Sequence, residues 1–78
     1  MRTRLENALD ASNINHHPAF GIFGGVAAVA WNDERVWIAE MDEEGNISEV
    51  EYDAEQLDQV KGGTREKALA LDEWMRGE

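Results

Sequence analysis

Residues 35–53 read RVWIAEMDEEGNISEVEYD, and this stretch decides the fold. Apolar and polar residues alternate on both sides of Glu43-Glu44-Gly45-Asn46, which is typical of two strands joined by a tight turn. We therefore expect strands over 35–42 and 47–53, with the turn between them. In a hairpin with a two-residue or four-residue loop, the numbers of two residues that lie opposite each other add up to an odd total.

The register of this hairpin decides which side chains share a face, because a slip by one residue turns every side chain over. The odd-total register gives one apolar face, which carries Trp37, Ala39, Met41, Ser48, Val50 and Tyr52. A three-residue loop would instead place Trp37 beside Glu51, so we predict the odd-total register. It leaves four acids together on the opposite face: Glu40, Glu49, Glu51 and Asp53.

The segment before the hairpin predicts a third strand and a helix. Phe20 to Trp31 is apolar and contains three glycines, which suits a buried strand bent at Gly24-Gly25, followed by a turn at 32–34. Leu5, Ala8 and Leu9 recur at helical spacing, which predicts a helix over about 2–13.

The segment after the hairpin predicts one or two further helices. A short helix from Asp53 or Ala54 should end at the left-handed cap of Lys61-Gly62-Gly63. Thr64 can cap a last helix, whose expected buried stripe is Ala68, Leu71, Trp74 and Met75. The expected fold class is α+β, with an N-terminal helix, a three-stranded antiparallel sheet and C-terminal helices, in a single domain over 1–78.

The second face of this sheet would be apolar as well, since Trp31, Val36, Ile38 and Phe23 lie there in the predicted register. Exposed apolar patches usually mark an interface. We expect the N-terminal helix to cover this face through Leu5 and Leu9. A homodimer formed through the same face is the alternative, so both a monomer and a homodimer are consistent with the sequence.

Length and composition limit the classes of function. A chain of 78 residues leaves little room for an enclosed active site, and it contains no cysteine for a disulfide or a thiolate zinc site. The longest apolar run, from Ala19 to Trp31, is too short to span a bilayer, and the charged N-terminus does not resemble a secretory signal. We expect a soluble protein of the cytoplasm.

Motifs for catalysis are weak. His16-His17 is the only histidine pair, and adjacent loop histidines before a proline are more often packing residues than metal ligands. Gly21-Ile22-Phe23-Gly24-Gly25 lacks the residues of a phosphate-binding loop. We therefore expect no enzyme, no catalytic residue, no resident metal and no cofactor.

Calcium binding is the main alternative at the level of motifs. With Glu40 as position one, Asp42, Glu44, Gly45 and Glu51 take positions three, five, six and twelve of an EF-hand-like loop. The first position is not Asp, however, and the flanking segments alternate like strands. An acidic turn with glycine forms readily without a metal ion.

The whole net charge of −10 lies between Asn32 and Asp58, where eleven carboxylates stand against the single base Arg35. The six acids and six bases of the other segments cancel. Such a block repels itself, and its usual partner is a positively charged surface. Direct binding to nucleic acid or to an anionic membrane is not expected, since both require Lys and Arg. A generic acidic interaction module, or an acidic surface that serves only solubility, is the alternative.

Strand spacing adds a geometric argument. Carboxylates two residues apart on one strand lie about 6.8 Å apart, while each DNA strand carries a phosphate about every 3.4 Å. Two rows of acids could therefore approach the charge density of a nucleic acid. The residues that we expect to bind a basic partner are Glu40, Asp42, Glu43, Glu44, Glu49, Glu51, Asp53, Glu55 and Asp58.

The run YDAEQLDQVKG at 52–62, followed by Asp72-Glu73-Trp74, resembles small acidic DNA-mimicking anti-CRISPR proteins of phages. The resemblance covers about a quarter of the chain. It implies an inhibitor without enzymatic activity that acts in the cytoplasm of the host cell and occupies the basic DNA-binding surface of Cas subunits in a type I CRISPR surveillance complex. Asp53, Glu55 and Asp58 match the acidic run, whereas Glu49 and Glu51 join them only through the strand geometry.

Overall fold

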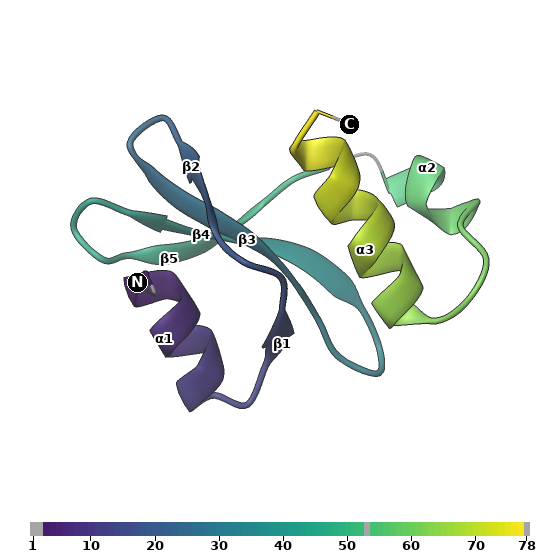
Figure 1. The fold of residues 1–78 in the computed structure, drawn as a ribbon, viewed down its shortest axis with the longest axis horizontal. Helices are drawn as coiled ribbons and strands as arrows, with labels where there is room; N and C mark the ends of the chain where they lie inside the picture. Colours follow the sequence, from purple (N-terminus) through teal and green to yellow (C-terminus); the bar gives the residue numbers. More distant parts are fainter. Residues whose placement is uncertain (1–2, 53, 78) are drawn as a thin grey trace.

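An antiparallel sheet forms the centre of the molecule, with helices on both of its faces (Figure 1). The computed structural model describes residues 3–52 and 54–77. The elements are α1 (Arg4–Ala11), β1 (Asn15–His16), β2 (Phe20–Ile22), β3 (Gly25–Trp31), β4 (Val36–Asp42), β5 (Ile47–Val50), α2 (Ala54–Asp58) and α3 (Thr64–Met75). The α+β class and the order of helix, sheet and helices are confirmed.

The sheet has five strands among the described residues, so the prediction of three strands is wrong. Its order is β1-β3-β4-β5, and β2 also pairs with β3, on the side where β1 lies. The segment 20–31 is thus two strands, β2 and β3, rather than one bent strand. Gly24 has a φ of +86° in the two-residue loop between them, and a Cβ on Gly25 would lie 2.1 Å from the Met41 carbonyl oxygen.

The register of the β4–β5 hairpin also differs from the prediction. Ile38 pairs with Val50, Ala39 with Glu49, Glu40 with Ser48 and Met41 with Ile47, so the numbers add up to an even total. The loop has three residues, because the Gly45 N–H donates to the Asp42 carbonyl and the Asp42 N–H to the Asn46 carbonyl. Gly45 has a φ of +92°, which closes this loop.

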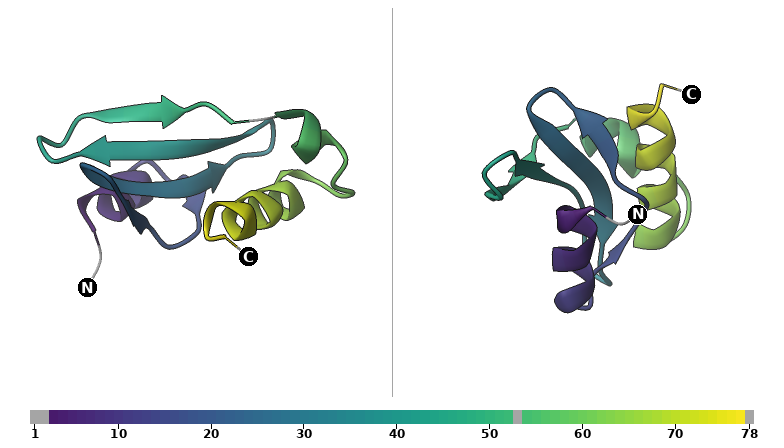
Figure 2. Two further views of the ribbon diagram at one scale, coloured as in Figure 1. Left: turned by 90° about the horizontal axis from the view of Figure 1, so that it is seen from above. Right: turned by 60° about the vertical axis from the view of Figure 1, so that its left-hand side comes forward.

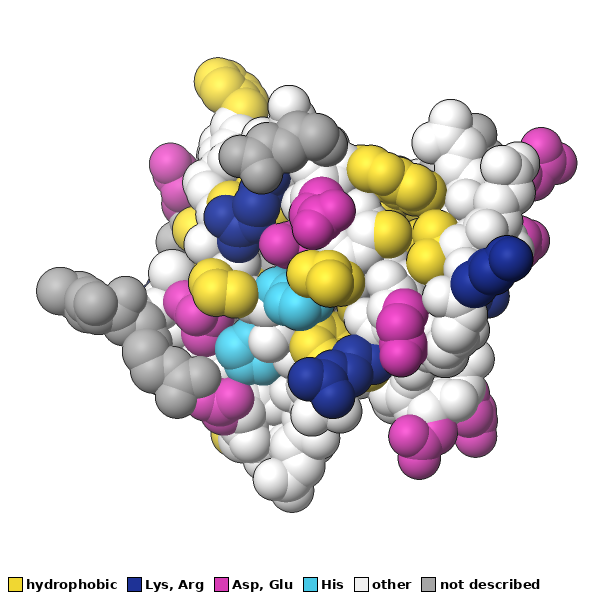
Figure 3. All heavy atoms as spheres, turned by 45° about the vertical axis from the view of Figure 1, so that its right-hand side comes forward, with side chains coloured by type: hydrophobic (Ala, Val, Ile, Leu, Met, Phe, Trp, Pro, Cys, Tyr) yellow, Lys and Arg dark blue, Asp and Glu magenta, His cyan; other side chains and the backbone are white. Residues whose placement is uncertain are grey.

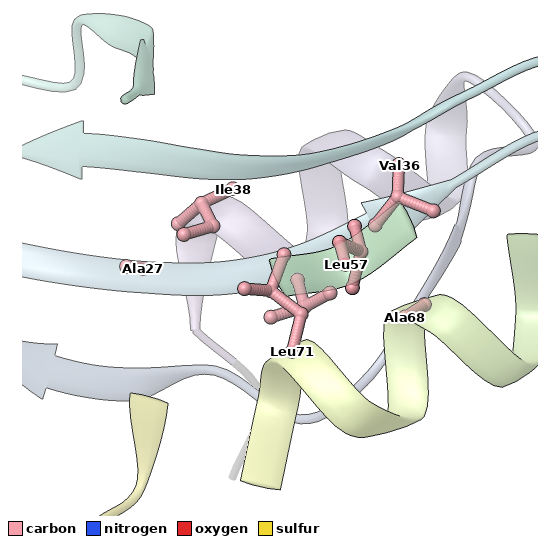
Figure 4. Packing of buried hydrophobic residues seen from close by; sticks show 7 residues of the cluster. Ala27, Val36, Ile38, Leu57, Ala68 and Leu71 are labelled. Carbon is pink, nitrogen blue, oxygen red and sulfur yellow. The ribbon is translucent and has the colours of Figure 1, made fainter. Parts of the chain in front are cut away.

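In this register, the side chains of β5 lie on the opposite sheet faces from those predicted. Val36, Ile38, Val50 and Tyr52 pack on the side of α2 and α3, with Val29, Leu57, Ala68 and Leu71. Figure 4 shows Val36 and Ile38 of this group together with Leu57, Ala68 and Leu71. Trp37, Ala39 and Met41 pack on the opposite side with Leu5 and Leu9 of α1. The N-terminal helix therefore covers a sheet face, but not the face of Trp31, Val36 and Ile38 that we expected (Figure 2).

The helix ends follow local chemistry. Helix α1 begins at a capping box, in which the Thr3 hydroxyl accepts the Glu6 N–H and the Glu6 carboxylate accepts the Thr3 N–H. It is shorter than the predicted range of 2–13, since Asn13 takes a φ of 56° and ends it.

Helix α3 departs from the prediction at both ends. Gly63, not Thr64, precedes its first residue, and the Thr64 hydroxyl donates to the Asn32 carbonyl instead. Ala68 and Leu71 are buried as predicted, but Trp74 is 41% and Met75 38% exposed. Asp72 is buried there instead and accepts hydrogen bonds from Arg76, which also donates to the Pro18 carbonyl.

Candidate protein-binding edge

Most of the predicted acids lie along one border of the sheet. We call this border the acidic edge and define it by the carboxylates of Asp42, Glu43, Glu44, Glu49, Glu51, Glu55 and Asp58. It runs from the β4–β5 turn along β5 to α2, as the upper rim in the left view of Figure 2. β5 is the last strand in the sheet order, so no other described strand lies outside it.

Asp42 shapes the turn at one end of the acidic edge. Its Oδ1 accepts the backbone N–H groups of Glu44 and Asn46, both at 2.9 Å, and its Oδ2 accepts the Asn46 side-chain amide at 3.2 Å. The hydrogen bond from the Asn46 backbone is the largest cause that lowers the pKa of Asp42 below its ordinary value. Asp42 thus holds the loop in which Glu43 and Glu44 are exposed.

Glu49 lies at the middle of the edge and is paired with a base. Both of its carboxylate oxygens accept hydrogen bonds from the Arg35 guanidinium, one of them at 3.1 Å. This hydrogen bonding is the main cause that lowers the pKa of Glu49. The Arg35 guanidinium also lies 4.4 Å from the centre of the Trp37 ring, so Arg35 is held between the two side chains.

The other acids take different positions. Glu51 follows β5 and is exposed, as are Glu55 and Asp58 of α2. Glu40 is half-buried and pairs with Ser48, which puts it on the sheet face opposite to Glu49. Glu40 therefore does not share a face with Glu49, contrary to the predicted ladder. Asp53 lies outside the described residues.

Tyr52 fixes the path of the chain where it leaves β5. Its hydroxyl donates to the Val36 carbonyl at 2.8 Å, and burial raises its pKa above the ordinary value of 10.0. This contact ties residue 52 to the start of β4. The chain is thereby directed from the sheet border towards α2.

Two exposed apolar side chains lie at the end of the sheet that carries the β4–β5 turn. Phe23 was expected on the second face of the sheet, but it lies in a loop instead. Phe23 is fully exposed in the loop between β2 and β3, and Ile47 is 53% exposed at the start of β5. The β2–β3 and β4–β5 loops lie at the same end of the sheet, because Gly25 pairs with Asp42 (Figure 1). The pattern Phe-Gly-Gly could have indicated a loop tip at Phe23.

The groups considered for metal binding do not form a cage. Within residues 3–52 and 54–77, no three histidine or acidic side chains are arranged to hold a metal ion. The Asp42 oxygens instead bind the turn itself, which accounts for the acidic sequence with glycine that resembled a calcium loop. His16 contacts Asp10 at 3.0 Å, and the His17 ring packs on Trp31 at 4.7 Å.

The histidines lie on a face of mixed charge. Figure 3 shows Lys and Arg side chains interspersed with Asp and Glu around the two histidines. The described part of the chain contains no helix that is long and apolar enough to cross a membrane. No family model, no curated protein and no solved structure matches this chain.

Proposed function

We propose that this chain is an acidic protein inhibitor that binds the basic nucleic-acid-binding surface of another protein. One observation carries the proposal: the stretch that holds all of the net charge supplies the β5 border of the sheet, beyond which no other described strand lies. Charges collected on one border attract a basic surface more strongly than the same charges spread over a globule, because their potentials add at the partner.

The dimensions of the molecule are compatible with the replacement of DNA. Its longest dimension is 35 Å, and the acidic edge runs along this direction (Figure 2). One helical turn of B-DNA has a length of about 34 to 36 Å. The edge is therefore long enough to cover the part of a basic groove that binds about one turn of duplex.

The mimicry lies in total charge rather than in regular phosphate spacing. Arg35 neutralises Glu49, and Glu40 lies on the other face, so β5 does not carry an unbroken ladder of acids. The exposed acids at the two ends of the edge supply the attraction: Glu43 and Glu44 in the turn, and Glu51, Glu55 and Asp58 after the strand. The partner that we propose from the resemblance of 52–62 is a type I CRISPR surveillance complex.

A competition experiment tests this function. A purified type I surveillance complex is mixed with a labelled target duplex and increasing amounts of the chain, and bound duplex is measured by gel mobility shift. We expect the chain to displace the duplex. Glu51→Lys should raise the concentration for half inhibition roughly tenfold or more, because a repulsive charge then faces the basic surface.

Glu73→Lys is the matched control, since it makes the same charge change at an exposed position of α3, away from the acidic edge. It should inhibit nearly as well as the unchanged chain. If both variants lose inhibition equally, net charge and not the edge is responsible. If the unchanged chain leaves duplex binding unaffected, the proposed inhibition of this class of complex is wrong.

A further inference from the structure

An apolar groove runs beside the open edge of β5. It has a volume of about 330 Å³ and lies between α1 and the β4–β5 hairpin. Its apolar lining consists of Ala8, Leu9, Ile14, Trp37, Ala39 and Ile47, and Glu49 lies at its border. A helix on one side and an unpaired strand edge on the other form the arrangement in which extended peptides add to a sheet.

The backbone of β5 has hydrogen-bonding groups that point away from β4. Asp42 and Asn46 are hydrogen-bonded across the hairpin, and such pairs alternate along an antiparallel ladder. The backbone N–H and C=O groups of Ser48 and Val50 therefore point towards Glu40 and Ile38 of β4. The N–H and C=O groups of Ile47 and Glu49 point to the outer edge.

Ile47 and Glu49 have their side chains on the same sheet face as Ala39 and Met41, which is the face of the groove. Residues of an added antiparallel strand that lie opposite them would both bond to their backbone and point into the groove. The same residues of the partner would thus provide the hydrogen bonds and the specificity.

We propose that β5 and this groove bind an extended segment of a basic partner protein as an additional antiparallel strand. The exposed acids select a basic occupant: an apolar residue fits opposite Ile47, and basic residues fit beside Glu43, Glu44 and Glu51. A basic residue also fits opposite Glu49, because a carboxylate has about four acceptor sites and Arg35 donates to only two of them. Pairing with a second copy is disfavoured, because it would bring two acidic edges together. The inference rests on the proposed function, since it names how the basic partner is held.

A synthetic peptide with the sequence KTKTLTKT, acetylated and amidated, is the probe. Its third residue, a lysine, is placed opposite Glu49, and its fifth, the leucine, opposite Ile47. Titration of the full chain, followed by amide NMR shifts, should give the largest changes at Ile47, Glu49 and the Trp37 indole. N-methylation of the third and fifth residues should weaken binding about tenfold or more, because their N–H groups bond to β5.

N-methylation of the fourth and sixth residues is the matched control. Their N–H groups point away from β5, so binding should stay within about twofold. In the chain, Ala8→Phe fills the groove and should weaken binding. Asn7→Phe adds the same ring at an exposed position of α1 and should not.

The outcomes separate this inference from the proposed function. Equal binding of the two N-methylated peptides overturns strand addition and shows attraction by charge alone. Absence of any peptide binding at about 1 mM, a concentration that detects even weak complexes, also overturns it. The competition with duplex DNA then still decides whether the acidic edge inhibits a nucleic-acid-binding protein.

Discussion

Asp42 and Glu49 of the acidic edge each accept hydrogen bonds that favour their ionised forms. Their sequence context does not distinguish them from Glu43 or Glu51, since all are acids in an alternating segment. The distinction arises from the chain path: the turn brings two N–H groups to Asp42, and the register brings Arg35 to Glu49. A count of charges therefore predicts the acidic edge but not the role of each acid in it.

The first prediction concerns the pH dependence of stability. Because the pKa of Asp42 is lower in the folded chain than its ordinary value, the unfolded chain binds more protons in acid than the folded chain does. The contribution of Asp42 is present above its ordinary pKa and is lost as the pH falls through the folded-state pKa. Asp42→Asn keeps an acceptor for the turn but cannot titrate, so its melting temperature should fall less between about pH 5 and pH 2.

Thermal unfolding across this range, followed by circular dichroism, makes the comparison. Glu43→Gln is the control. It removes a carboxylate from the same turn, but Asp42, not Glu43, accepts the hydrogen bonds from the Glu44 and Asn46 N–H groups. Its acid dependence should resemble that of the unchanged chain. An Asp42→Asn variant with the same acid dependence as the unchanged chain would contradict the assigned role.

At the scale of elements, the β4–β5 hairpin decides which residues meet which helix. Alternation predicted both strands, although β5 ends at Val50 and not near residue 53. It could not choose the register, because β4 carries apolar residues on both of its faces. Trp37 can lie beside Glu51 because β5 is at the border of the sheet. Acids there are in contact with water, and Glu49 pairs with Arg35. The three-residue loop with Gly45 at a positive φ determines the register instead.

A substitution at Gly45 tests this determinant. Gly45→Ala puts a Cβ on a residue with a φ of +92°, which should cost about 1 to 2 kcal/mol in the free energy of unfolding. Gly45→Asn should cost less, because Asn tolerates the left-handed region. Chemical denaturation of the three proteins measures both values. Equal stability of Gly45→Ala and the unchanged chain would contradict the loop conformation.

Helix α1 provides the second prediction at this scale. Leu5 is fully buried against the sheet, so Leu5→Ala should lower the free energy of unfolding by about 2 to 5 kcal/mol, which is enough to unfold so small a protein. Leu69→Ala removes a side chain that is 50% exposed on α3 and should have a much smaller effect. Similar losses in the two variants, measured by denaturant unfolding, would show that α1 does not cover the sheet.

At the scale of the whole molecule, the sequence predicts the sign and the position of the charge but not the surface around it. The charge block between residues 32 and 58 is visible without a structure. The open border of β5, the groove beside α1 and the exposed Phe23 depend on strand order and on loop geometry. These features follow from contacts between distant segments, which alternation and composition do not encode.

In the function that we propose, the acidic edge replaces nucleic acid on a basic surface. The most direct measurement is the affinity of the chain for a purified type I surveillance complex, by calorimetry at about 50 mM and about 500 mM salt, with and without bound duplex. We predict that affinity falls steeply with salt and that bound duplex excludes the chain, because both occupy the same basic groups. Binding that is insensitive to salt, or that persists unchanged on the duplex-bound complex, would contradict the claim.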